Sequence, residues 1–149
     1  MSAYRRILAA VDGSGASNKG LREAVRLAKE ERAQLFILHV VNEYTAYAMP
    51  DAGAYAAVDI ATVLRKSGKQ ILAKAKTAVE KQGLRPQAIL RETIVGPAAD
   101  TIIREAKKQR ADLIVLGTHG RRGVRRLVLG SDAEQVVRMA PVPVLLVRA

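Results

Sequence analysis

Residues 117–131 combine the residue types and the spacing that best suit an anionic ligand. Glycines occur throughout the stretch, in the pattern Gly117-x2-Gly120-x9-Gly130-Ser131. Glycine lets a backbone approach phosphate oxygens closely, and the first N–H groups of a following helix point at such a ligand. The stretch also carries four cationic side chains, those of Arg121, Arg122, Arg125 and Arg126. It predicts a site for the phosphates of a nucleotide.

A second candidate is the turn Asp12-Gly-Ser-Gly15, which follows an apolar run over 7–11. Asp12 stands at the end of a predicted strand, where a carboxylate could hold a ribose or a metal-bound water. The segment from Gly13 to Asn18 lacks the third glycine of the dinucleotide fingerprint, so a strand-to-helix turn with Ser14 or Ser17 as N-cap is the better interpretation. The sequence contains no Walker-type Gly-x4-Gly-Lys-Ser/Thr, which excludes that class of NTPase site.

The elements that must position these residues alternate between strand and helix. Apolar runs predict buried parallel strands over 7–11, 34–41, 112–116 and 141–147, with a more polar edge strand over 87–94. Amphipathic patterns predict helices over 16–32, 58–82, from Gly96-Pro97 onward, and over 132–139. The alternation predicts an α/β fold in which ligands bind beyond the carboxyl ends of the strands, where the strand order changes direction.

Several local features carry their own expectations. Residues 42–57 should form a loop, because breakers interrupt any regular pattern there: Asn42, Pro50, Asp51 and Gly53. Gly68 should loosen its helix locally. The prolines at the start of the last run cannot donate ladder hydrogen bonds, which puts that strand at a sheet edge. His39, within an apolar strand, should be a core residue with its hydrogen bonds satisfied.

Composition limits the classes of protein and partner. The 149 residues are 49% hydrophobic, 26% charged and without cysteine, which fits one folded domain and excludes disulfides and thiolate metal sites. No stretch approaches the roughly 20 apolar residues of a membrane span, and no secretory h-region follows Met1, so a cytoplasmic location is expected. The net charge of +11 attracts polyanions, but aromatic residues make up only 3%. Nucleic-acid binding is therefore a lesser alternative. The two histidines have no pairing that would suggest a metal cluster.

The glycine stretch and three further segments, in the same order, resemble the universal stress protein family. The four segments are Ile-Leu-Ala-Ala-Val-Asp12-Gly-Ser14, Leu38-His-Val-Val41, Asp112-Leu-Ile-Val-Leu-Gly-Thr-His-Gly120 with its Gly130-Ser131, and Pro-Val-Pro-Val-Leu-Leu-Val147. The resemblance covers the chain and implies one domain over 1–149. It implies an α/β fold with an open five-stranded parallel sheet of order 3-2-1-4-5 and helices on both faces, Rossmann-like and similar to adenine nucleotide alpha hydrolases.

The same resemblance implies ATP, with or without Mg²⁺, between the ends of the first and fourth strands. Adenine and ribose would be bordered by Ala10, Val11, Asp12 and Val40. Ribose and phosphates would be lined by Leu116, Gly117, Thr118, His119, Gly120, Gly130 and Ser131. Arg121 and Asp132 flank these residues and join the predicted site. The arginines of 121–126 either screen phosphate charge or form a solvated lid.

The segment Ser131-Asp-Ala-Glu134 has the pattern of a capping box, in which Ser131 and Glu134 satisfy free N–H groups at the start of the last helix. Capping and phosphate contact are compatible if the Ser131 hydroxyl is shared. Asp132 and Glu134 add negative charge where a phosphate would compete with them.

The leading hypothesis is a regulatory stress-response protein that binds ATP and forms a homodimer through Val142–Val147. No nucleophile–base pair and no paired carboxylates stand out, so no catalysis beyond slow ATP hydrolysis is expected. One alternative is an interaction or signalling dimer of the same fold that binds no nucleotide. The other is a basic protein that associates with nucleic acid through charge.

Overall fold

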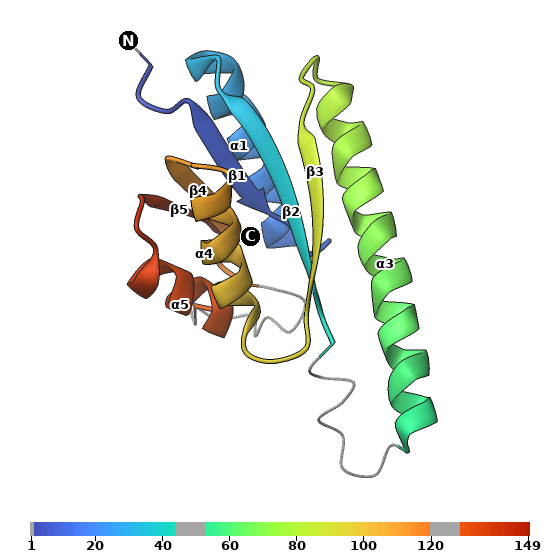
Figure 1. The fold of residues 1–149 in the computed structure, drawn as a ribbon. Helices are drawn as coiled ribbons and strands as arrows, with labels where there is room; N and C mark the ends of the chain where they lie inside the picture. The colour runs from blue at the N-terminus through green and yellow to red at the C-terminus, as the bar shows by residue number, and fades with distance from the viewer. Residues whose placement is uncertain (1, 44–52, 120–128) are drawn as a thin grey trace.

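Five parallel strands form one sheet in the order β3-β2-β1-β4-β5. They are β1 (Arg6–Ala10), β2 (Gln34–Asn42), β3 (Gln87–Thr93), β4 (Leu113–Gly117) and β5 (Val144–Val147). The computed structural model describes residues 2–43, 53–119 and 129–149. The strand order confirms the prediction, and it changes direction between β1 and β4 (Figure 1).

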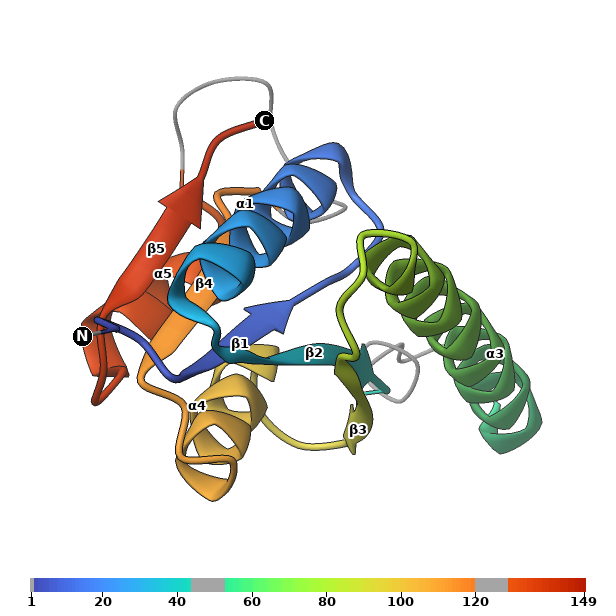
Figure 2. The ribbon, with the colours of Figure 1, turned by 90° about the horizontal axis from the view of Figure 1, so that it is seen from above.

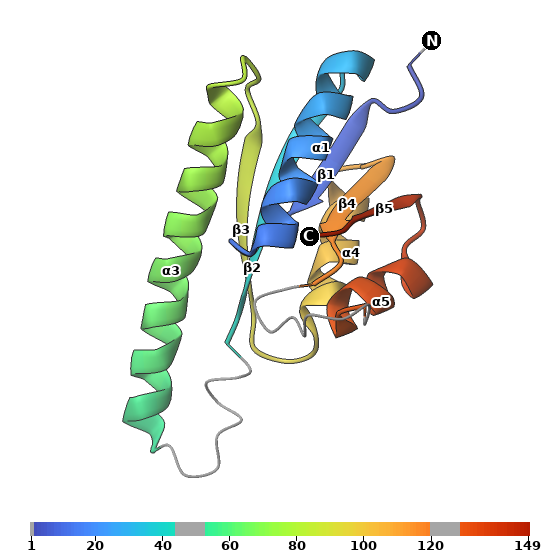
Figure 3. The same cartoon turned by 180° about the vertical axis from the view of Figure 1, so that it is seen from behind.

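Two helices cover each face of the sheet. Helices α1 (Gly15–Glu31) and α3 (Ala54–Glu80) lie on one face, and α4 (Ala98–Lys108) and α5 (Ser131–Met139) lie on the other (Figures 2 and 3). Neighbouring strand residues point to opposite faces, so Ile7 packs in the core under α1 while Leu8 packs in the core over α4. Both faces are buried, which explains why the central strands read as continuous apolar runs. In the part of the chain that the structure describes, no helix has the length and apolar character required to cross a membrane.

Helix α1 follows directly from its local sequence. Ser14 is the N-cap, and its Oγ accepts a hydrogen bond from the Ser17 N–H over 3.2 Å. The predicted apolar stripe is buried against the sheet, namely Leu21, Ala24, Val25 and Ala28. The helix ends at Arg32, whose φ of 55° is left-handed and stops the helical hydrogen-bond pattern.

The predicted loop over 42–57 is wrong at both ends. Strand β2 continues through Asn42, and α3 already begins at Ala54 with Gly53 as its N-cap. Residues 54–57 contain no glycine or proline, so the helix can extend back to the last breaker. At α4, Pro97 flanks the helix as its N-cap and Ala98 is the first helical residue.

The expectation that Gly68 loosens α3 is also wrong, because the helix is continuous across this residue. A Cβ atom at Gly68 would lie 2.8 Å from Cδ2 of His39 and 2.8 Å from Cγ2 of Val41. Gly68 is therefore a position at which α3 passes so close to β2 that a side chain would collide with it. His39 is 8% exposed, and its Nδ1 lies 2.7 Å from the carbonyl oxygen of Val11, which confirms it as a core residue with a hydrogen-bond partner.

Candidate functional site

The carboxyl ends of β1 and β4 lie side by side at the point where the strand order changes direction. The register pairs Ile7 with Leu113 and Ala9 with Val115, so the two strands end at nearly the same level. On the far side of β4, Gly117 pairs with Val147 at the end of β5. The predicted turn at Asp12 follows β1, and the predicted glycine stretch over 117–131 follows β4. Sheets of this kind bind ligands at such an edge.

The apolar members of the predicted site divide between the two faces of the sheet. Ala10, Val40 and Leu116 pack in the core beneath α4 and α5. Val11 packs in the opposite core, beneath α1 and α3. Leu129 joins the first group, although the sequence analysis did not select it. The sequence offered one signal for this residue, namely an apolar side chain directly before Gly130.

Asp12 takes part in the turn that leads from β1 into α1. Its Oδ1 accepts a hydrogen bond from the Ser14 N–H over 2.9 Å. Its own N–H donates to the Oγ of the buried Ser17 over 3.0 Å. No bond to the second carboxylate oxygen of Asp12 occurs among the described residues. The carboxylate thus fixes the turn with one oxygen, and the turn does not use the other.

Ser14 connects the two loops that border the site. Besides accepting from the Ser17 N–H, its Oγ donates to the carbonyl oxygen of His119 over 3.3 Å. The contact of His119 is therefore made by its backbone, and its side chain is half-exposed. The sequence predicted Ser14 or Ser17 as the helix cap; the structure has Ser14 in that position and adds a bridge from the turn after β1 to the segment after β4.

Thr118 holds three elements together. Its N–H donates to the carbonyl oxygen of Val147 over 2.9 Å, and its own carbonyl accepts from the Gly130 N–H over 2.8 Å. Its Oγ1 is buried and has no hydrogen-bond partner in the described part of the chain. A buried hydroxyl without a partner costs free energy, so this atom is a natural recipient for a polar atom of a ligand.

Gly117, predicted for ligand approach, has a packing role in the structure. A Cβ atom there would lie 2.7 Å from the backbone carbon of Ala16 and 2.7 Å from the backbone nitrogen of Ser17. Such distances are shorter than real Cβ contacts, so only glycine lets the first turn of α1 rest on the end of β4. Gly20, further along α1, also lies against the end of β4, because a Cβ atom there would be 3.4 Å from the backbone nitrogen of Gly117. Gly120 and Arg121, also predicted for the site, lie outside the described residues.

The predicted capping box at α5 is wrong. Gly130 is the N-cap, no side chain of the described residues caps the helix, and Ser131 is the exposed first residue of α5. The cause is tertiary, because Asp132 turns its Oδ1 to the Ala99 N–H at the start of α4, over 3.1 Å. The first helical bond runs from the Glu134 N–H to the Gly130 carbonyl. Within the described residues, the N–H groups before Glu134 in α5 have no intrahelical partner, which is the usual state of the first turn of a helix.

A charged cluster that the sequence analysis missed lies at the ends of β2 and β3. The fully buried Glu43 accepts from Nε of Arg65 over 2.6 Å, and the same nitrogen lies 3.2 Å from Oε1 of Glu92. The second oxygen of Glu43 has no hydrogen-bond partner in the described ranges. Nothing in the local sequence pairs these residues, because they come from three separate elements.

Comparisons with known proteins find relatives that match nearly the whole length of this chain. The model of the universal stress protein family matches residues 3–148. Universal stress protein MJ0531 of Methanocaldococcus jannaschii is 35% identical over 145 residues, which cover 97% of this chain and 82% of that protein. A solved structure from the universal stress protein family of Burkholderia pseudomallei has a TM-score of 0.80 at 30% identity, covering 100% of this chain and 99% of that one. A universal stress protein in complex with cAMP has a TM-score of 0.65 at 24% identity, covering 99% and 98%.

Proposed function

Because the chain belongs to the universal stress protein family, we propose that it is a regulatory stress-response protein that binds ATP at the carboxyl ends of β1 and β4. One observation carries the proposal. The first turn of α5, which no side chain caps, begins one hydrogen bond away from Thr118, whose hydroxyl is buried without a partner in the described residues. Free helix N–H groups beside an unsatisfied hydroxyl form a polar surface suited to phosphate.

The remaining predicted residues suit the other parts of the nucleotide. Ala10, Val40 and Leu116 offer an apolar surface for the base. The Asp12 oxygen that the turn leaves unused suits a ribose hydroxyl, or Mg²⁺ through a bound water. The solved relative in complex with cAMP shares the fold at 24% identity. That likeness supports the fold of the site, and the choice of ATP rests on the resemblance of the glycine stretch to the family's nucleotide-binding signature.

The proposal includes a cytoplasmic homodimer with at most slow ATP hydrolysis. The outer edge of β5 is the surface we assign to pairing, since an apolar edge strand is a hazard for aggregation unless it is covered. Among the described residues no group of three or more histidine, aspartate or glutamate side chains is arranged to hold a metal. Any Mg²⁺ would therefore be held chiefly by the phosphates, with Asp12 assisting.

Isothermal titration with ATP tests the site through one variant and a matched control. Gly130 and Gly53 are both helix N-caps with nearly the same backbone, φ −58° and ψ 149° against φ −56° and ψ 160°. We expect Gly130→Val to abolish measurable ATP binding, because the side chain would occupy the approach of the phosphates. Gly53→Val should bind as the native chain does, since a Cβ at Gly53 meets nothing within 4 Å.

Circular dichroism should show that both variants keep their helices. Equal ATP affinity in the native chain and Gly130→Val would refute the site. Equal losses in the two variants would refute it as well, because the effect would then belong to the helix start and not to the ligand.

A further inference from the structure

A groove between α1 and α3 plays no part in the proposed function over most of its length. Its volume is about 830 Å³, within the range of roughly 300–1,000 Å³ that small-molecule sites occupy. Most of its lining residues belong to α1 and α3, the two helices that cover one face of the sheet (Figure 3). Only its end at Val11 and Gly13 adjoins the strand ends of the nucleotide site.

The floor of the groove is apolar. It is made by side chains from both helices and the end of β1, which belong to one core cluster or pack against it: Val11, Leu21, Val25, Ile71, Ala75 and Val79. Water in contact with such a floor gains little from hydrogen bonding. An apolar chain laid along the floor would be favoured by the hydrophobic effect.

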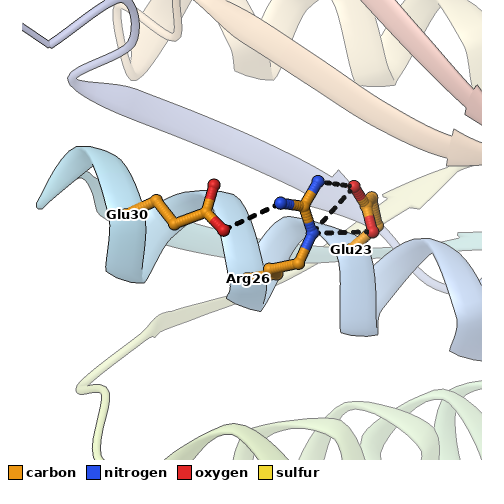
Figure 4. A network of polar contacts seen from close by, with 3 residues as sticks. All are labelled: Glu23, Arg26 and Glu30. Carbon is orange, nitrogen blue, oxygen red and sulfur yellow. Dashed lines mark hydrogen bonds and ion pairs between the residues drawn. The ribbon is translucent and has the colours of Figure 1, made fainter.

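The rim of the groove is cationic. Arg22, Arg26, Lys29 and Lys74 line it, and within the described ranges no aspartate or glutamate is among its lining residues. Arg26 is held on the surface of α1 between Glu23 and Glu30 (Figure 4), so its charge is balanced. Lys29 donates from Nζ to Oε1 of Gln82 over 3.3 Å and thereby joins α1 to the turn that follows α3.

Arg22 and Lys74 differ from those two cations. Neither forms an ion pair or a side-chain hydrogen bond within the described part of the chain. Each lies on a different helix, so the groove has an uncompensated positive charge on both sides. The complementary ligand carries a negative group beside an apolar body.

The shape of the groove selects among such ligands. Along α1 the lining residues run from Asn18 to Lys29, which is about 16 Å at the helical rise. An extended acyl chain can lie along this length on the apolar floor, with its charged end at the cationic rim.

We propose that the α1/α3 groove binds a long-chain carboxylate. The acyl chain lies on the apolar floor, and the carboxylate pairs with the cations of the rim, Arg22 and Lys74 foremost. This ligand is chemically unrelated to the nucleotide, and its site needs no residue of the glycine stretch. A long-chain acyl group is thus a second class of molecule that this chain can recognise.

Titration with saturated carboxylates of increasing length, from butyrate through octanoate and laurate to palmitate, tests the apolar floor. All are kept below the concentrations at which they form micelles. We expect the affinity to rise about fourfold for each added methylene, the fold-change that corresponds to about 0.8 kcal/mol per buried methylene. Equal affinity for octanoate and palmitate would overturn the proposal, because surface charge alone would then explain the binding.

Two tryptophan variants test the location. Ala78 and Ala73 are both exposed residues of α3, but only Ala78 lines the groove. Ala78→Trp should fill the groove and lower palmitate affinity at least tenfold, whereas Ala73→Trp should leave it unchanged. Equal palmitate affinity in the two variants would overturn the site. ATP titration of both variants separates this result from the nucleotide proposal, since neither residue belongs to that site.

Two double variants test the carboxylate contact. Arg22→Gln with Lys74→Gln removes the two unpaired charges of the rim, and Lys66→Gln with Lys69→Gln removes two exposed charges of α3 outside it. Both double variants have the same net charge. The first should weaken palmitate binding but leave binding of the uncharged monoacylglycerol of the same chain unchanged. The second should weaken neither, and equal losses in the two double variants would overturn the assignment of the rim.

Discussion

At the scale of single residues, Glu105 is a buried acid whose charge the fold retains. The residue is 4% exposed, and its carboxylate accepts from Arg91 over 2.9 and 3.1 Å and from Gln109 over 2.8 Å. Burial acts to raise the pKa of this carboxyl. The hydrogen bonds from Gln109 and Arg91, with the charges of Arg91 and Lys108, outweigh burial and hold the pKa below its usual 4.5. The charged form is therefore the form that stabilises the fold.

The lowered pKa of Glu105 gives a pH dependence with a defined sign. A carboxyl with a lowered pKa in the folded state contributes stability that is complete above its unfolded pKa and is lost as the pH falls through its folded pKa. We expect the free energy of unfolding in urea to fall as the pH decreases from about 4.5, the usual value of a glutamate. Glu105→Gln should flatten this dependence and cost about 1–3 kcal/mol at neutral pH.

Glu134→Gln is the control for that measurement. Glu134 pairs with Arg138 over 2.7 Å on the exposed surface of α5, and such surface pairs contribute only about 0–1 kcal/mol. The free energy of unfolding of Glu134→Gln should depend on pH as that of the native chain does. A Glu105→Gln variant whose stability falls with acid as steeply as the native protein's would contradict the role given to Glu105.

Gly117 provides a second prediction at this scale. A methyl group at Gly117 would meet the backbone of Ala16 and Ser17 at 2.7 Å, so Gly117→Ala should cost about 1–3 kcal/mol through overpacking. Gly15→Ala is the matched control, because a Cβ there meets nothing within 4 Å. It should be neutral or stabilising by up to about 1 kcal/mol, since glycine within a helix is less stable than alanine. Chemical denaturation measures both, and similar effects of the two changes would count against the packing role.

At the scale of elements, the sequence predicts the helices and strands whose determinants lie within their own segments. Helix α1 was predictable because its cap at Ser14 and its apolar stripe lie within its own residues. The polar strand β3 and the proline-led strand β5 were predictable as sheet edges for the same reason. The order of the strands could not be read from their composition, and it came from the resemblance to a family. Long-range pairing leaves little trace in a single segment.

The errors arise where distant segments meet. From the sequence, Gly68 was expected to loosen its helix. The structure shows that a side chain at this position would collide with His39 of β2. The residues from Ser131 onward match the sequence pattern of a capping box. In the structure, however, Asp132 contacts α4 and Gly130 is the N-cap. In the site, the sequence indicated which strand ends meet. It could not indicate that Thr118 would join β4, β5 and α5.

The outer edge of β5 leads to a prediction about assembly. The carbonyls of Pro143 and Val147 accept hydrogen bonds from Ile114 and Thr118, so by alternation Val144 and Leu146 direct their backbone groups away from β4. Leu146→Pro removes one of these outward N–H groups and should convert the dimer to monomers in light scattering. Leu146→Ala keeps the N–H and should remain dimeric. A native chain that stays monomeric at high concentration would refute pairing through this edge.

At the scale of the whole molecule, the net charge of +11 offers a competing explanation for any ATP binding. Binding through surface charge alone is screened over roughly 8–10 Å at near-physiological ionic strength, so it should weaken steeply with salt. It should also scarcely distinguish ATP from GTP, which carry the same phosphates. A site that contacts base and ribose should prefer ATP, and the preference should survive moderate salt.

Competition titrations at two salt concentrations decide between these explanations. We expect ATP to bind more tightly than GTP at both concentrations, and double-stranded DNA to displace ATP poorly at the higher one. If DNA displaces ATP readily and the two nucleotides behave alike, the alternative of a basic protein that associates with nucleic acid through charge is the better one.

Thr118 hydrogen-bonds both to Val147 at the end of the edge strand and to Gly130 at the start of α5. Thr118 therefore connects the proposed nucleotide site to the strand that forms the proposed dimer seam, and the two equilibria are subject to thermodynamic reciprocity. If the nucleotide strengthens the association of two chains by some factor, association must strengthen nucleotide binding by the same factor. The concentration of the protein would then set its apparent affinity for ATP, so that its abundance in the cell would become part of the signal.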